Sequence, residues 1–126
     1  MQLETFWRLM FRGNNADAAE RCLARALAHI AGEVFDGPKP YWKIPVLWEA
    51  TVCSPFALPT AEGVFGLLVV ADRLASGWLV SGPLMADEKL VIFEGVFNPD
   101  TSSRPHVAGL EWASFSVGQV SGATPE

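Results

Sequence analysis

The most apolar stretch of the chain, residues 90–97, carries hydrophobic side chains at both of its alternating sets of positions. These are Leu90, Ile92 and Val96 on one side and Val91, Phe93 and Phe97 on the other. A strand with one exposed face alternates apolar and polar residues, whereas a strand covered on both faces is apolar throughout. The pattern therefore predicts a central strand in a sheet that is covered on both sides.

Four further segments show the alternation that is typical of strands. They are residues 3–11, 46–53, 78–84 and 110–117. Proline has no backbone N–H to donate, so we expect Pro83 to end its strand or to lie on a sheet edge. The short polar connection over residues 86–89 predicts that the strand before it and the strand after it form an antiparallel pair.

Residues 17–31 have the spacing of an amphipathic helix. Apolar side chains recur every three or four residues and form one stripe, which consists of Ala19, Cys22, Leu23, Ala26, Leu27 and Ile30. Asn14 or Asn15 can cap the start of this helix, and Gly32 can stop it.

Residues 61–76 fit two different structures. The first is a helix that begins after Thr60 and ends before Gly77. The second is a strand that forms a hairpin with residues 78–84. The length and the flanking residues favour the helix, although two internal glycines weaken it.

Two segments are predicted to be irregular. Residues 36–45 contain three prolines, which remove backbone donors, and residues 98–105 are rich in turn-forming residues. The chain is therefore predicted to be α+β. It would have a mostly antiparallel sheet of about five strands with one or two helices packed on it, in the order β-α-β-(α)-β-β-β. We expect residues 1–118 to form a single domain and residues 119–126 to form a flexible C-terminal tail.

Half of the 126 residues are hydrophobic, which predicts a sizeable core rather than a disordered chain. The formal net charge is -5, from 14 acidic residues against 9 Lys and Arg residues. This balance disfavours nucleic acid and anionic membranes as partners. The longest uncharged apolar run, residues 64–71, is far shorter than a membrane span. The first residues lack the basic segment of a signal peptide, so we expect a cytoplasmic protein.

The residues that carry most enzyme chemistry are few and scattered. The two histidines, His29 and His106, lie on a helix face and at the end of a loop, where accurate catalytic geometry is hard to hold. The two cysteines, Cys22 and Cys53, have no CxxC spacing and are predicted to be reduced and buried. We find no metal-ligand spacing and no glycine-rich phosphate loop. The sequence thus predicts no catalytic residues, no metal site and no cofactor, and it favours a protein that is not an enzyme.

Acidic and aromatic side chains are the better candidates for a binding surface. Five acids fall in or beside the last three predicted strands: Asp87, Glu88, Glu94, Asp100 and Glu111. If these strands are adjacent, the acids can ring one edge of the sheet and steer a basic partner, although solubility alone also explains them. Glu94 interrupts an apolar strand, so we expect it to be buried beside a cation, which Arg8, Arg73 or Lys89 could supply. Tyr41 and Trp42 lie in the proline-rich segment, where large aromatic side chains can anchor a partner.

In size, acidic charge and element order, the chain resembles the bacterial immunity proteins of polymorphic and contact-dependent toxin systems. These are small, often acidic α+β cytoplasmic proteins that bind a toxin domain and block its active site or its access to substrate. The resemblance implies a non-enzymatic module that binds a basic protein partner, a toxin domain, through the acidic and aromatic residues named above.

Two alternatives stay open. Four tryptophans lie in predicted strands and are expected in the core: Trp7, Trp48, Trp78 and Trp112. The last three of them and Phe93 can instead line a pocket between sheet and helices, with Glu94 or Cys53 as its polar group. The protein would then bind a small molecule or act as an enzyme. The second alternative is a homo-oligomeric structural protein, such as a homodimer, that associates through an open sheet edge or through the proline-rich segment.

Overall fold

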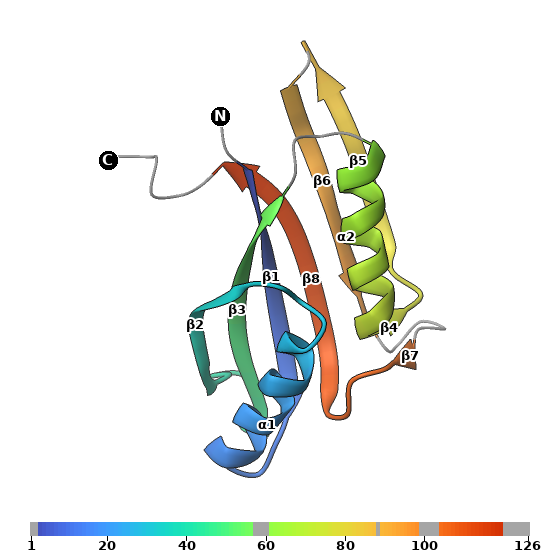
Figure 1. Cartoon of the computed structure of the whole chain (residues 1–126). Coiled ribbons are helices and arrows are strands. Elements are labelled where there is room, and N and C mark those ends of the chain that lie inside the picture. Colours follow the sequence, from blue (N-terminus) through green and yellow to red (C-terminus); the bar gives the residue numbers. More distant parts are fainter. Residues whose placement is uncertain (1–2, 57–60, 88, 99–103, 120–126) are drawn as a thin grey trace, which may run out of the picture.

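The computed structural model describes residues 3–56, 61–87, 89–98 and 104–119 of the chain. Two helices and eight strands follow one another along these residues (Figure 1). In chain order they are β1 (Leu3–Arg12), α1 (Ala16–Leu27), β2 (Glu33–Pro40), β3 (Leu47–Phe56), α2 (Ala61–Leu74), β4 (Ala75–Ser76), β5 (Leu79–Ala86), β6 (Lys89–Phe97), β7 (Arg104–Pro105) and β8 (Leu110–Gln119). The short strands β4 and β7 pair with each other in a separate two-stranded sheet.

The other six strands form one antiparallel sheet in the order β2-β3-β1-β8-β6-β5. The predicted α+β class and the antiparallel pairing of the late strands are confirmed, with one strand more than expected. The order is mirrored about the central β1–β8 pair. Outward from this pair, β3 and then β2 follow on one side, and β6 and then β5 follow on the other.

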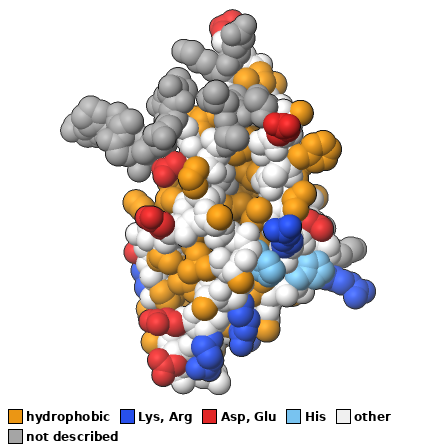
Figure 2. All heavy atoms as spheres, viewed as in Figure 1, with side chains coloured by type: hydrophobic (Ala, Val, Ile, Leu, Met, Phe, Trp, Pro, Cys, Tyr) orange, Lys and Arg blue, Asp and Glu red, His pale blue; other side chains and the backbone are white. Residues whose placement is uncertain are grey.

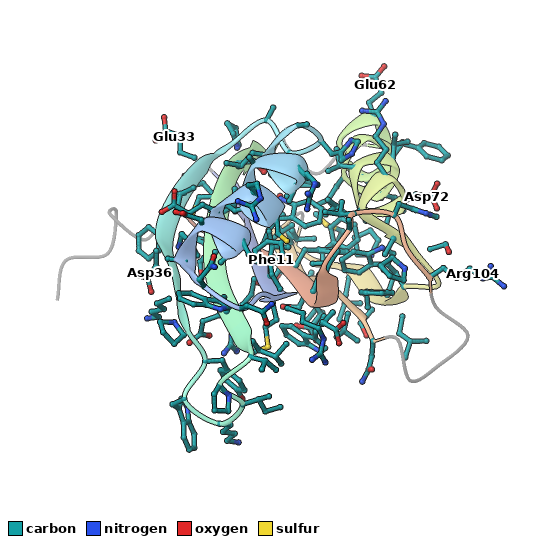
Figure 3. The ribbon with its side chains drawn as sticks, turned by 90° about the horizontal axis from the view of Figure 1, so that it is seen from below. Phe11, Glu33, Asp36, Glu62, Asp72 and Arg104 are labelled. Carbon is teal, nitrogen blue, oxygen red and sulfur yellow. The ribbon has the colours of Figure 1, made fainter. Side chains whose placement is uncertain are left out.

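Both helices lie on the same face of the sheet (Figure 1). Figure 3 shows them as a layer above the sheet, with Phe11 enclosed between the two layers. The core fills this space, and its largest fully buried side chains are Trp7, Phe11, Phe93, Phe97 and Phe115. Burial of each side chain of this size contributes about 1.5–3 kcal/mol to folding. No helix of the described residues lies on the opposite side of the sheet, which we call the open face.

The prediction that residues 90–97 form a central strand covered on both sides is wrong. This segment is β6, which lies second from the edge, whereas β1 is paired on both sides at the centre. Phe93 and Phe97 are buried against the helices, but Ile92 on the other side of the strand is 42% exposed. The strand is apolar on both sides because the open face itself displays hydrophobic side chains. A sequence pattern cannot distinguish such exposed hydrophobic residues from buried ones.

The prediction that residues 36–45 are irregular is wrong for its first part. Residues 33–40 form β2, which is an edge strand of the sheet. An edge strand tolerates prolines because one side of it needs no ladder hydrogen bonds. Pairing with β3 skips Gly37 and Pro38, and Gly37 has a φ of 91°, a left-handed conformation that glycine adopts at little cost. Pro83 likewise lies in an edge strand, β5, as predicted.

Both predicted helices are confirmed. The side chain of Asn15 caps α1 by accepting a hydrogen bond from the backbone N–H of Ala18 at 2.9 Å. This helix ends at Leu27, earlier than the expected stop at Gly32. The ambiguous segment 61–76 is helical as α2, and its last residues form β4. Within the described residues, neither helix has the length and apolar character that crossing a membrane requires.

Candidate binding surface

Strand register arranges the side chains of the open face in rows that run across the sheet. Residues directly opposite each other in adjacent antiparallel strands share a face, with Cβ atoms about 5 Å apart. The first row, from β5 to β2, consists of Ser81, Glu94, Ser116, Phe6, Cys53 and Glu33. The second row consists of Leu79, Val96, Ser114, Arg8, Thr51 and Asp36. The third row contains Trp112, Met10, Glu49 and Lys39.

Two depressions lie side by side on these rows. The first, which we call the Glu94 depression, has a volume of about 380 Å³ and lies on β5, β6 and β8. Its lining includes Leu79, Ser81, Glu94, Val96, Trp112, Ser114 and Ser116. The second has a volume of about 430 Å³ and is bordered by Arg8, Met10, Tyr41, Ile44, Leu47, Glu111 and Trp112. Trp112 lines both, so the two depressions form one continuous surface.

The segment between β2 and β3 forms the outer wall of the second depression. The backbone N–H of Tyr41 donates to the carbonyl of Leu47 at 2.8 Å, which holds the ends of this segment together. Trp42 is 79% exposed and lies at a tilt to Tyr41, with 6.3 Å between the ring centres. The Lys43 ammonium lies 5.1 Å from the centre of the Trp42 ring. The exposure of Trp42 is consistent with an aromatic anchor and excludes that it caps the core.

Ion pairs occupy most of the charged groups on the open face. Three pairs link described residues: Arg8 with Glu49 at 2.9 Å, Arg12 with Glu111 at 3.3 Å and Lys39 with Asp36 at 2.7 Å. The guanidinium carbon of Arg8 also lies 5.8 Å from the centre of the Trp112 ring. Glu94 has no ion-pair partner among the described side chains. Glu94 is therefore free to meet a cation from outside, as is Glu33 at the other end of the first row.

The predicted acids do not all lie together. Glu94 is exposed on the open face, so the expectation that it is buried beside a cation is wrong. The reason is again that one face of β6 is solvent-facing. Glu111 lies at the start of β8 and borders the same surface, together with Tyr41. Asp87 lies in the turn between β5 and β6, and Glu88 and Asp100 fall outside the described residues.

The aromatic residues of the predicted internal pocket do not line one cavity. Trp78 and Phe93 belong to a core cluster with Trp7 and Phe115, whose ring centres lie 5.3–6.3 Å apart. Trp112 instead lies on the open face, where it pairs with Met10. A different pocket of about 270 Å³ does lie between the sheet and α2. Its lining includes Thr5, Trp7, Ile30, Ser54, Glu62 and Leu67. The indole N–H of Trp7 donates to the Ser54 hydroxyl at 3.1 Å.

The histidines and cysteines show no catalytic arrangement. Figure 2 shows the histidines on the helix-bearing face beside Lys and Arg side chains. None of the three ion pairs between described residues involves a histidine. Both cysteines are free, and Cys22 is buried whereas Cys53 is half-buried. Burial raises the pKa of the Cys53 thiol, and the Glu4 carboxylate raises it further, which disfavours the reactive thiolate. No group of three possible metal ligands occurs among the described residues.

Sequence reasoning missed Trp112 and the serines as parts of a binding surface. Trp112, Ser114 and Ser116 alternate with the buried Ala113 and Phe115 in β8. This alternation was the available signal, and it separates the open face from the core. Comparison with protein-family models, with curated proteins and with solved structures found no match to this chain.

Proposed function

We propose that the protein is a non-enzymatic protein-binding module that engages a basic partner through the open face of its sheet. The observation that carries this proposal is the continuous surface around Trp112. It joins two depressions, displays exposed hydrophobic side chains and contains the Glu94 carboxylate, which forms no ion pair with any side chain that the structure describes. Half-buried aromatic side chains with neighbouring charges are the usual anchors of protein interfaces.

The resemblance to immunity proteins supports a more specific form of the proposal. In this form the partner is a bacterial toxin domain, and the protein neutralises it by covering its active site or blocking its access to substrate. The net charge of -5 favours the approach of a basic partner. Tyr41 and Trp42 would contact the partner at one end of the open face, and Glu94 at the other.

The test is a parallel affinity purification from the source cell with three forms of the protein. They are the wild type, Glu94→Lys on the open face and Asp72→Lys on α2. Both variants change an exposed acid to lysine and so change the net charge equally. Figure 3 shows Asp72 on the outer side of α2, away from the sheet. We expect one stoichiometric, basic protein to be retained by the wild type and by Asp72→Lys and to be lost from Glu94→Lys.

Trp112→Ala extends the test to the apolar part of the surface, and we expect it to weaken binding of the same partner. The identified partner is then expressed alone and together with this protein. These two cultures show whether the partner inhibits growth and whether this protein restores growth. Equal retention by all forms would contradict the open-face proposal. A partner that does not inhibit growth would contradict the proposal of an immunity protein, but it would not contradict the proposal of a protein-binding module.

A second candidate is a small-molecule-binding protein, and the mixed lining of the Glu94 depression is the observation that favours it. Small-ligand sites are mostly apolar with a few polar groups, as Leu79, Val96 and Glu94 are here. Native mass spectrometry of the purified protein distinguishes the two. A retained small molecule that is lost in Glu94→Lys, with no protein partner, would replace the protein-binding proposal.

A further inference from the structure

Three polar side chains form an uninterrupted row at one end of the Glu94 depression. The register places Glu94 directly opposite Ser81 in β5 and directly opposite Ser116 in β8. All three residues are exposed, and they lie on the same face. The carboxylate is therefore flanked on both sides by hydroxyl groups, each of which can donate or accept a hydrogen bond.

The other end of the depression is largely apolar. In the next row, Leu79 lies opposite Val96, and Val96 lies opposite Ser114. Trp112 follows along β8 and lines the same depression. A ligand in this site thus meets a hydrophobic wall at one end and a carboxylate with two hydroxyls at the other. This matches a long amphipathic side chain, which has an aliphatic stem and a charged head.

The open face already binds one guanidinium group, that of Arg8. Arg8 pairs with the Glu49 carboxylate at 2.9 Å and lies over the ring of Trp112, with 5.8 Å from its guanidinium carbon to the ring centre. Glu94 offers a second carboxylate on the same open face, two rows from Trp112, and both residues line the Glu94 depression. No described cation pairs with Glu94, because Arg8 is engaged and the two other ion pairs of the open face involve other acids.

We propose that the Glu94 depression receives an arginine side chain of the protein partner. The inference rests on the proposed function and names the chemistry of its contact. The planar guanidinium presents five donors, of which two can bind the Glu94 carboxylate while others reach Ser81 and Ser116. The arginine stem lies along Leu79 and Val96 towards Trp112. A lysine has a compact head with three donors and no planar fork, so it satisfies this row less well.

The first experiment uses a small probe and the intact protein. N-acetyl-arginine amide and its uncharged isostere N-acetyl-citrulline amide are titrated into ¹⁵N-labelled protein. The amide signals of Ser81, Glu94 and Ser116 and the indole signal of Trp112 are followed. We expect the arginine probe to shift these signals with a weak but saturable affinity and the citrulline probe to leave them unchanged. We expect Glu94→Gln to weaken arginine binding at least several-fold.

Glu62→Gln, at an exposed acid at the start of α2, is the matched control and should bind the arginine probe like the wild type. Equal shifts from the citrulline probe, or unchanged binding in Glu94→Gln, would overturn the proposal. N-acetyl-lysine amide is the third probe. Binding as tight as that of the arginine probe would show a general cation site and overturn the arginine assignment.

Failure of this inference differs from failure of the proposed function. If the partner binds, and Trp112→Ala weakens it while Glu94→Gln does not, the open face is the interface but Glu94 does not receive an arginine. If no open-face variant affects any partner, the proposed function itself fails. Replacement of each arginine of the identified partner in turn should reveal one whose loss is not additive with Glu94→Gln.

Discussion

Strands β2 and β5 occupy the two edges of the same sheet, at mirrored positions about the β1–β8 pair, and both contain a Gly-Pro step. Gly37 and Gly82 have the same φ of 91°, and at each of them the register with the inner strand shifts. A Cβ atom at Gly37 would collide with the Glu49 carbonyl, and one at Gly82 with the Ile92 carbonyl. Both edge strands thus contain a Gly-Pro step at which the regular pairing with the inner strand is interrupted.

The side chains of the two edges differ in charge, although both edges display hydrophobic residues: Val34 and Phe35 of β2 are 41% and 66% exposed. β2 carries Glu33 and the ion pair between Asp36 and Lys39, and Figure 3 shows Glu33 and Asp36 at this edge, away from the core. All eight residues of β5 are exposed and uncharged. Four of them are large hydrophobic residues: Leu79 (64% exposed), Leu84 (53%), Val80 (41%) and Met85 (41%).

Natural edge strands are protected against pairing by charges and prolines. β2 uses both devices, whereas β5 has its proline alone. Exposed hydrophobic residues that are contiguous mark contact surfaces, and Leu79 and Ser81 of β5 also line the Glu94 depression. The difference is therefore one of charge, and β5 borders the surface that we propose as a binding site.

The largest expected effect concerns the Gly-Pro step that both edge strands contain. We expect Gly37→Ala and Gly82→Ala each to lower the free energy of unfolding by roughly 2–4 kcal/mol, because each adds a left-handed alanine and a collision with the neighbouring strand. Chemical denaturation measures both values. The control is Gly66→Ala in α2, where nothing lies within 4 Å of the added Cβ. It should stabilise the protein by about 1 kcal/mol, since alanine favours a helix more than glycine does.

A loss at one edge glycine only would show that the two Gly-Pro steps are not equivalent. In that case the mirrored order of the strands would not extend to the structural role of their edges, and the comparison would have to rest on side chains alone.

A smaller effect tests the difference in charge between the edges. We expect Leu84→Lys in β5 to raise several-fold the concentration at which the protein begins to self-associate, because it places a charge on the hydrophobic edge. We expect the double variant Asp36→Asn, Lys39→Leu in β2 to have the opposite effect. Sedimentation velocity over a range of concentrations measures both. Neither variant should change the free energy of unfolding by more than about 0.5 kcal/mol, since the residues are exposed.

Unchanged self-association in both variants would show that edge charge does not control contacts between copies of this chain. A homodimer through β5 would then be ruled out as the explanation of its hydrophobic side chains. Retention of the partner by Leu84→Lys would further restrict the partner's contact to the Glu94 depression.

The smallest effect concerns the ion pair that only β2 possesses. A hydrogen bond and the charge of Lys39 lower the pKa of the Asp36 carboxyl from its ordinary value of 3.8. A lowered pKa in the folded state stabilises the protein above the unfolded pKa, and this contribution is lost as the pH falls through the folded pKa. We expect Lys39→Met to raise the pKa of Asp36 towards 3.8, as measured by ¹³C NMR of the carboxyl group. A pKa that stays low in this variant would assign the shift to the backbone instead.

Much of the fold follows from local patterns. The alternation in β1 and β8, the apolar stripe and Asn15 cap of α1, and the length of α2 all predict the elements that the structure contains. β2 was missed because its prolines are compatible with a strand only at an edge, and edge position is a property of the whole sheet. The candidate site was partly predicted, since Glu94, Glu111, Tyr41 and Trp42 lie on or beside one surface.

The sequence by itself determined the α+β class, the antiparallel late strands and the acidic charge, because periodicity, short connections and composition act locally or in sum. Tertiary structure alone decided that both helices cover the same face and that β6 is exposed on the other. It also decided that Ser81, Glu94 and Ser116 share one row. The physical reason is that a strand pattern shows which side chains share a face but not whether another layer covers that face. Cross-strand neighbours depend on register, which joins residues that are distant along the chain.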